Sequence, residues 1–246
     1  SDDNQFQKIK KYINLDNQKI ISFGKIKVES LIIQDIFNKN NHKSIINKNL
    51  KRNMPACIIY TSGTSGNPKG VVLSHGGILS NCEGAVELLK PLIEKKDPIF
   101  LTWLPLSHSY EHTVQFIQIV VGARVYYAES LEKLILNMES AKPTIMTAVP
   151  RFYQNLFTKI NMNFQKQDGV KRKIISSTLN LGKKLLKKEK LNFFEKIMNF
   201  ICNLLVRKKI QRQFGGNLQA FISGGGALDQ NIGEFLNAIG LPTLQG

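Results

Sequence analysis

Short apolar runs alternate with amphipathic stretches of helical length, and this alternation limits the fold more than any other feature of the chain. The pattern starts near residue 55 and predicts strands over 55–60, 71–74, 99–104, 124–128 and 144–149. It predicts helices over 75–93, 107–121 and 130–141, and a further helical stretch that begins at Arg151. Strands separated by helices favour a parallel sheet with helices packed on its faces. We therefore expect an α/β fold of layered, largely parallel sheets with flanking helices.

The pattern also suggests four segments, with bounds 1–53, 54–151, 152–213 and 214–246. The first has no usable motif and one short predicted strand, at 19–23. In the second, the apolar run 55–60 is bounded by proline and by a Gly/Ser/Thr cluster, which predicts a buried strand. The third is a helical insertion, with helices expected over 183–190 and 193–208. The fourth resumes the α/β alternation.

The positive charge of the chain is concentrated in the insertion. The chain has 34 Lys and Arg against 18 Asp and Glu, a net charge of +16, and the stretch 159–213 alone has 15 basic and 3 acidic residues. Three interpretations are open: a solvated helical face, an interfacial contact with an anionic membrane, or nucleic-acid binding. The second would use the apolar stripe predicted on one side of the helix 193–208, which comprises Phe194, Ile197, Met198, Ile201, Leu204 and Leu205.

Other features bear on the compartment. The chain has no apolar run of the roughly 18 to 20 residues that a membrane span needs and no secretory signal at its polar start. Its three cysteines, Cys57, Cys82 and Cys202, have neither disulfide-framework nor metal-ligand spacing. These features favour a cytoplasmic protein, peripheral on the inner face of a membrane if the interfacial interpretation holds.

The stretch from Tyr60 to Gly70 predicts a phosphate-binding loop. Its three glycines let backbone N–H groups approach an anion, its four Ser and Thr hydroxyls add donors, and Lys69 supplies a positive charge. In the common nucleotide loop, Gly-Lys is followed by Ser or Thr at the start of a helix. Here Lys69 precedes Gly70 and a predicted strand, so the loop is not that of an ordinary phosphate-loop NTPase.

Several motifs in order resemble those of the adenylate-forming superfamily. Residues 61–70 (TSGTSGNPKG) are similar to its signature loop, and residues 103–111 (WLPLSHSYE) to the second motif of its long-chain fatty acid–CoA ligases. Residues 148–153 (AVPRFY) resemble a further motif of that branch. The stretches 214–216 (FGG) and 221–228 (FISGGGAL) resemble its adenine-binding strand and turn. The resemblance begins near Met54 and implies part of the large N-terminal domain of such an enzyme.

The resemblance implies a two-step reaction in which ATP and Mg²⁺ convert a long-chain fatty acid into an acyl-adenylate and CoA then takes the acyl group. It places His108 between the ATP and acyl pockets as the catalytic candidate, and it gives Thr61 a contact with Mg²⁺. Glu111 is either a carboxylate beside the ligand or a member of an ion pair. The expected ATP-binding residues are Thr61, Ser62, Gly63, Thr64, Ser65, Gly66 and Lys69 at the phosphates, and Gly225, Gly226 and Ala227 at the adenine.

The chain ends at Gly246, one residue before the family's Tyr-Gly-x-Thr-Glu motif, whose glutamate binds Mg²⁺. The ribose-binding aspartate and the C-terminal domain of the family are absent as well, so we expect the 246 residues alone to be an inactive fragment. Two alternatives stay open. One is an adenylate-forming enzyme for aryl or amino acids, and the other is a basic nucleic-acid-binding module, although no nucleic-acid partner is expected.

Overall fold

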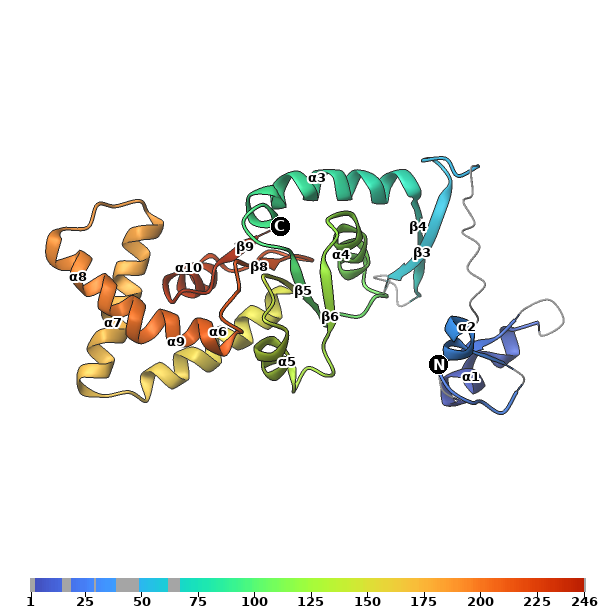
Figure 1. The fold of residues 1–246 in the computed structure, drawn as a ribbon, viewed down its shortest axis with the longest axis horizontal. Coiled ribbons are helices and arrows are strands. Elements are labelled where there is room, and N and C mark those ends of the chain that lie inside the picture. Colours follow the sequence, from blue (N-terminus) through green and yellow to red (C-terminus); the bar gives the residue numbers. More distant parts are fainter. Residues whose placement is uncertain (1–2, 15–18, 29, 39–48, 62–66, 246) are drawn as a thin grey trace. The chain divides into compact units, whose positions relative to one another are not determined.

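The computed structural model describes residues 3–14, 19–28, 30–38, 49–61 and 67–245, and the chain forms two compact units, 1–50 and 51–246 (Figure 1). The first unit contains α1 (Asp3–Ile9), the 3₁₀ turn η1 (Lys10–Tyr12), β1 (Ile21–Ser22), β2 (Leu31–Ile32) and α2 (Ile33–Asn38). The strand predicted over 19–23 is thus confirmed, although it shrinks to two residues paired in parallel with β2. Phe6 is buried in this unit.

A five-stranded sheet is the centre of the second unit, and all its strands are parallel, as predicted. The strand order is β6-β5-β7-β8-β9, for β6 (Arg124–Tyr127), β5 (Ile99–Thr102), β7 (Ile145–Ala148), β8 (Ala220–Ser223) and β9 (Thr243–Gln245). The helices that follow or precede these strands are α3 (His75–Ile93), α4 (Ser109–Val120), α5 (Leu134–Ala141) and α10 (Gln230–Ala238). The α/β prediction is therefore confirmed.

Both faces of this sheet are covered, and adjacent residues of one strand enter different cores. Phe100 and Ile145 pack with α3 and α4 on one face, whereas Leu101 and Met146 pack with α5, α6 (Pro150–Gln165) and α10 on the other. This is the two-residue alternation of a β-strand. It explains why the inner strands have uninterrupted runs of apolar residues, since a strand of a parallel sheet that is buried on both faces has no polar side.

The strands β3 (Pro55–Thr61) and β4 (Lys69–Ser74) form an antiparallel hairpin outside that sheet. The predicted strand exists, but the prediction that it is buried is wrong: in β3, which is described throughout, only Ile59 is buried, and Ile58 and Tyr60 are exposed. The physical reason is that β3 pairs with β4 alone, while the contacts of the hairpin with α3 and α4 involve Ala56, Cys57 and Leu73.

The insertion consists of α6, α7 (Gly169–Leu186), α8 (Phe193–Cys202), a π-helical turn η2 (Asn203–Arg207) and α9 (Lys208–Gln213). The helix predicted over 193–208 is confirmed, whereas the one predicted over 183–190 is only the last turn of α7 and ends at Leu186. A capping box between Asn192 and Glu195 fixes the start of α8. Among the described residues, no helix is long and apolar enough to span a membrane.

Candidate nucleotide-binding site

A glycine turn follows β8 at the carboxyl edge of the sheet. The Gly224 N–H donates to Ala148 O at 3.1 Å, so the turn starts where β8 leaves its pairing with β7. A Cβ at Gly224 would lie 2.3 Å from the ring of Tyr110, so only glycine fits at this position without a clash. Gly225 has φ +75°, a conformation that favours glycine. Gly225, Gly226 and Ala227 are all exposed, so their backbone is accessible to a ligand.

His108 lies beside this turn and caps α4. Its Nδ1 accepts a hydrogen bond from the Tyr110 N–H at 3.2 Å, which assigns the ring proton of the neutral imidazole to Nε2. A Cβ built on Gly225 would lie 3.7 Å from His108 Cε1 and 3.8 Å from Val149 Cγ1. The structure therefore brings together two segments that the sequence singled out separately, His108 and the turn Gly225–Ala227, with the His108 side chain exposed.

A buried polar cluster joins α4 to the strands beneath the turn. The Tyr110 hydroxyl donates to Ile222 O at 3.2 Å, Trp103 Nε1 donates to Thr147 O at 3.0 Å, and the Thr147 hydroxyl lies 3.5 Å from Glu111 Oε2. Glu111 is fully buried, and its Oε1 has no hydrogen-bond partner among the described residues. Burial raises the pKa of Glu111 above its ordinary value, and hydrogen bonds from neighbouring side chains offset part of the rise.

This geometry corrects the two roles considered for Glu111. A buried carboxyl group beneath the turn is not a carboxylate exposed to a ligand, and Glu111 forms no ion pair with any described residue. Glu111 and Tyr110 instead anchor the first turn of α4, which carries His108. Burial also raises the pKa of the Tyr110 hydroxyl, with a smaller contribution from the charge of Glu111. Tyr110 therefore stays protonated and keeps donating to Ile222 O.

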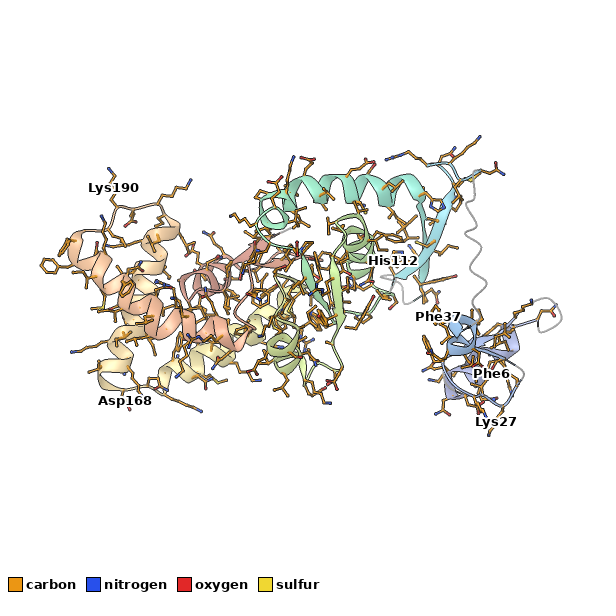
Figure 2. The ribbon with its side chains drawn as sticks, viewed as in Figure 1. Phe6, Lys27, Phe37, His112, Asp168 and Lys190 are labelled. Carbon is orange, nitrogen blue, oxygen red and sulfur yellow. The ribbon has the colours of Figure 1, made fainter. Side chains whose placement is uncertain are left out.

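The phosphate-side candidates lie at the loop end of the hairpin, where β3 ends and β4 begins. Thr61 pairs with Lys69 across β3 and β4, and its hydroxyl lies 3.5 Å from Lys69 O. Both residues are exposed. The loop residues between them that were predicted to bind phosphate lie outside the described residues, namely Ser62, Gly63, Thr64, Ser65 and Gly66. The hairpin contacts α4 through Cys57 Sγ, 3.4 Å from Nε2 of His112, which Figure 2 labels near β3 and β4.

Comparison of the chain with known protein families gives a match over nearly its whole length. The family model described as AMP-binding enzyme matches residues 3–246. The chain belongs to the AMP-binding enzyme family. The match starts at residue 3, so the first unit falls within this family although no motif in it was recognised in the sequence.

Several curated relatives of the chain are named as long-chain acyl-CoA synthetases or long-chain-fatty-acid–CoA ligases. The chain is 32% identical over 182 residues to long chain acyl-CoA synthetase 6, peroxisomal, of Arabidopsis thaliana, an alignment covering 74% of the chain and 25% of the relative. It is 31% identical over 198 residues to long-chain-fatty-acid–CoA ligase ACSBG2 of Homo sapiens, covering 78% and 29%. The chain thus spans between a quarter and a third of the length of these relatives.

Solved structures of low sequence identity share the fold. ATP-bound MatB from Rhodopseudomonas palustris matches with a TM-score of 0.53 at 19% identity, over 82% of this chain and 30% of that one. MenE from Bacillus subtilis, in complex with AMP, matches with a TM-score of 0.52 at 15% identity, over 88% and 42%. These neighbours support the assignment of the chain to the fold of adenylate-forming enzymes.

Two residues that connect the elements of the candidate site in this AMP-binding family member, Tyr110 and Trp103, were not predicted from the sequence. Tyr110 packs on Gly224 and bonds to β8, and Trp103 bonds to β7, yet neither was proposed as a site residue. Both lie within the motif 103–111. Their signal was an aromatic side chain with a polar end, directly after β5 for Trp103 and in the first turn of α4 for Tyr110. Such a residue usually finds a hydrogen-bond partner when buried.

Proposed function

We propose that this AMP-binding protein activates long-chain fatty acids, in the cytoplasm or at a membrane surface facing it. The fatty acid carboxylate would attack the α-phosphate of ATP, which gives an acyl-adenylate and releases pyrophosphate. The thiolate of CoA would then attack the acyl carbonyl carbon and expel AMP. The observation that carries the proposal is the proximity of His108 to the turn at Gly225, since it brings together two motifs that resemble those of long-chain fatty acid–CoA ligases.

ATP would be held by backbone and by charge in this proposal. The exposed backbone of the turn Gly225–Ala227 would pack against the adenine, and the loop end of the hairpin would offer the Thr61 hydroxyl and Lys69 to the phosphates. Positioning and neutralisation of charge are the main contributions a protein makes to phosphoryl substitution. His108, with Nε2 free to donate, would orient the carboxylate against the nucleotide.

The donor set suits Mg²⁺ brought by the nucleotide. The described residues contain no group of three His, Cys, Asp or Glu side chains that could hold a metal by themselves. Mg²⁺ typically keeps several waters and binds through substrate phosphates plus one or two protein oxygens. The Thr61 hydroxyl at the exposed hairpin end is a hard oxygen ligand of that kind, so Thr61 would contribute one ligand to an ion held mainly by ATP.

The test is a calorimetric titration of the 246-residue chain with MgATP. Gly225→Ala should weaken binding at least tenfold, because a side chain would project from the turn toward the nucleotide. Gly122→Ala is the matched control: Gly122 also has a positive φ, +62°, and lies in open space away from the turn. Alanine introduces the same kind of backbone strain at both positions. Equal affinities of the two variants for MgATP, or no ATP binding by the parent chain, would overturn the proposal.

The acid substrate is tested separately. Palmitate should compete with a fluorescent fatty acid for binding to the chain, whereas benzoate and free amino acids should not. Displacement by an aryl or amino acid at lower concentration than palmitate would instead favour the alternative adenylate-forming enzymes.

A further inference from the structure

The solvent side of α8 and η2 is apolar. Phe193, Phe194 and Phe200 are 72%, 80% and 69% exposed, and Ile197, Leu204 and Leu205 are exposed as well. These six residues, here named the α8 face, include most of the stripe predicted from the sequence. That stripe was expected on one side of the helix, and the structure turns this side toward solvent rather than toward the sheet.

The inward side of the same helix explains this orientation. Cys202 and Val206 are buried there, and the buried Arg207 donates to Asn199 Oδ1 and to two backbone carbonyls of α7 and α10. The π-helical turn at Asn203–Arg207 widens the helix at this point, so Arg207 points inward. The helix is therefore fixed by its polar and small residues, and its large apolar residues face outward.

Lysines surround the α8 face. Five exposed lysines lie along this segment: Lys187, Lys188 and Lys190 in the turn before α8, Lys196 on α8, and Lys208 directly after η2. Figure 2 shows Lys190 in this turn, pointing away from the sheet. The nearby carboxylate of Glu195 is already neutralised by Lys184 at 2.6 Å and by the capping box. A ligand at this surface would meet exposed phenylalanine and leucine side chains surrounded by positive charge.

We propose that the α8 face docks on an anionic lipid bilayer, with the apolar side chains entering the headgroup region and the lysines contacting lipid phosphates. Apolar residues on one helix face flanked by Lys and Arg are the pattern of helices that lie in a membrane interface. A second copy of the chain is a poor occupant, because two segments each carrying a charge of +12 repel each other. Nucleic acid would match the lysines but not the aliphatic residues Ile197, Leu204 and Leu205, which cannot stack on bases as aromatic side chains do.

This surface is separate from the nucleotide site, and the proposal does not depend on adenylation. ATP binding and membrane binding can therefore succeed or fail independently. The first experiment is co-sedimentation of the 246-residue chain with vesicles of phosphatidylcholine alone or with 30% phosphatidylglycerol. The chain should partition at least tenfold more strongly onto the anionic vesicles. Equal partition onto both, or onto neither, would overturn the proposal.

Two sets of variants separate the apolar from the electrostatic contribution. Phe193→Ser/Phe194→Ser should lower partition onto anionic vesicles at least tenfold, whereas the equally exposed control pair Leu88→Ser/Ile119→Ser should change it less than twofold. A lysine near an anionic surface contributes about fivefold in binding. Replacing the three turn lysines (Lys187, Lys188 and Lys190) with glutamine should therefore reduce partition at least tenfold, unlike the exposed control triple of Lys51, Lys90 and Lys95.

Insertion is read directly from fluorescence. Phe194→Trp adds a second tryptophan to the single Trp103 of the chain, and its emission should shift to the blue and be quenched by lipids brominated on the acyl chain. Leu88→Trp is the control and should show neither effect. Quenching that is equal in the two variants would contradict docking through the α8 face, as would salt-sensitive retention on DNA without vesicle binding.

Discussion

Replacing Arg207 with methionine should loosen the helices of the insertion from one another and from α10. The guanidinium is buried and makes three hydrogen bonds: Nε to Ala238 O at 2.8 Å, Nη1 to Asn199 Oδ1 at 2.8 Å and Nη2 to Thr178 O at 3.1 Å. Ala238 is the last residue of α10, so its carbonyl lies at the negative end of that helix dipole. Burial lowers the pKa of Arg207, but an arginine remains charged in a protein.

The magnitude follows from two opposing contributions. A hydrogen bond to a charged group contributes about 1.5 to 3 kcal/mol, so the three bonds together contribute roughly 5 to 9 kcal/mol. Taking the charge out of water costs several kcal/mol, and methionine removes that cost while filling much of the same volume. The net loss in the free energy of unfolding should therefore be about 2 to 4 kcal/mol. Arg207→Lys, which keeps the charge and one or two bonds, should lose about half as much.

Urea unfolding followed by circular dichroism measures this difference, provided that the slope of the transition is unchanged. Lys208→Met is the matched control, because Lys208 is the next residue and is exposed. An exposed substitution of this kind should stay within about 0.5 kcal/mol of the parent chain. If Arg207→Met also stayed within that range, the three bonds of Arg207 would not stabilise the packing of α7, α8 and α10, and the prediction would be refuted.

Three further predictions concern close packing and titration. Gly182→Ala places a Cβ 2.5 Å from Ala238 Cβ and should destabilise the chain by about 1 to 3 kcal/mol in thermal unfolding, although alanine favours a helix by about 1 kcal/mol. Gly224→Ala, whose Cβ would lie 2.3 Å from the Tyr110 ring, should cost a similar amount and also weaken MgATP binding, measured by calorimetry. The pKa of Glu111 is raised in the folded chain, so the unfolded chain loses this proton at a lower pH. The free energy of unfolding should therefore fall as pH rises from about 4.3, the pKa of a free glutamate, toward the pKa of Glu111 in the folded chain. The total loss is about 1.4 kcal/mol for each unit by which folding raises this pKa. Glu111→Gln should flatten that part of the stability–pH curve in urea unfolding.

The inner strands of the sheet, β5, β7 and β8, could be predicted from the sequence because they are buried on both faces. Phe100 and Leu101 are adjacent and point to opposite cores, so the strand reads as a run of apolar residues whichever face is considered. The helix α3 was also predicted with the bounds it has, 75–93. Its start is set by Ser74, whose hydroxyl accepts from the Gly77 N–H at 3.1 Å, a local interaction that sequence can encode.

Exposure of apolar residues could not be predicted in the same way. The run 55–60 and the stripe on 193–208 have the pattern of buried elements, yet Tyr60 and Phe194 are exposed. Periodicity tells which residues share a face, whereas burial depends on whether another element lies against that face. The helix α7 was missed for a different reason: its first turns, Gly169 to Lys173, are basic and polar and show no apolar periodicity.

The proximity of His108 to Gly225 results from the strand order rather than from either motif. β7 lies between β5 and β8, and neighbouring strands are about 4.8 Å apart, so β5 and β8 are separated by about 10 Å. The helix α4 follows β5, and the Tyr110 side chain in its first turn reaches across to Ile222 O on β8. Parallel strands end at the same edge, so this one contact sets the first turn of α4 against the turn that follows β8. Because a Cβ at position 224 would collide with the ring of Tyr110, the first glycine of the turn is required by this tyrosine, whereas Gly225, Gly226 and Ala227 remain exposed.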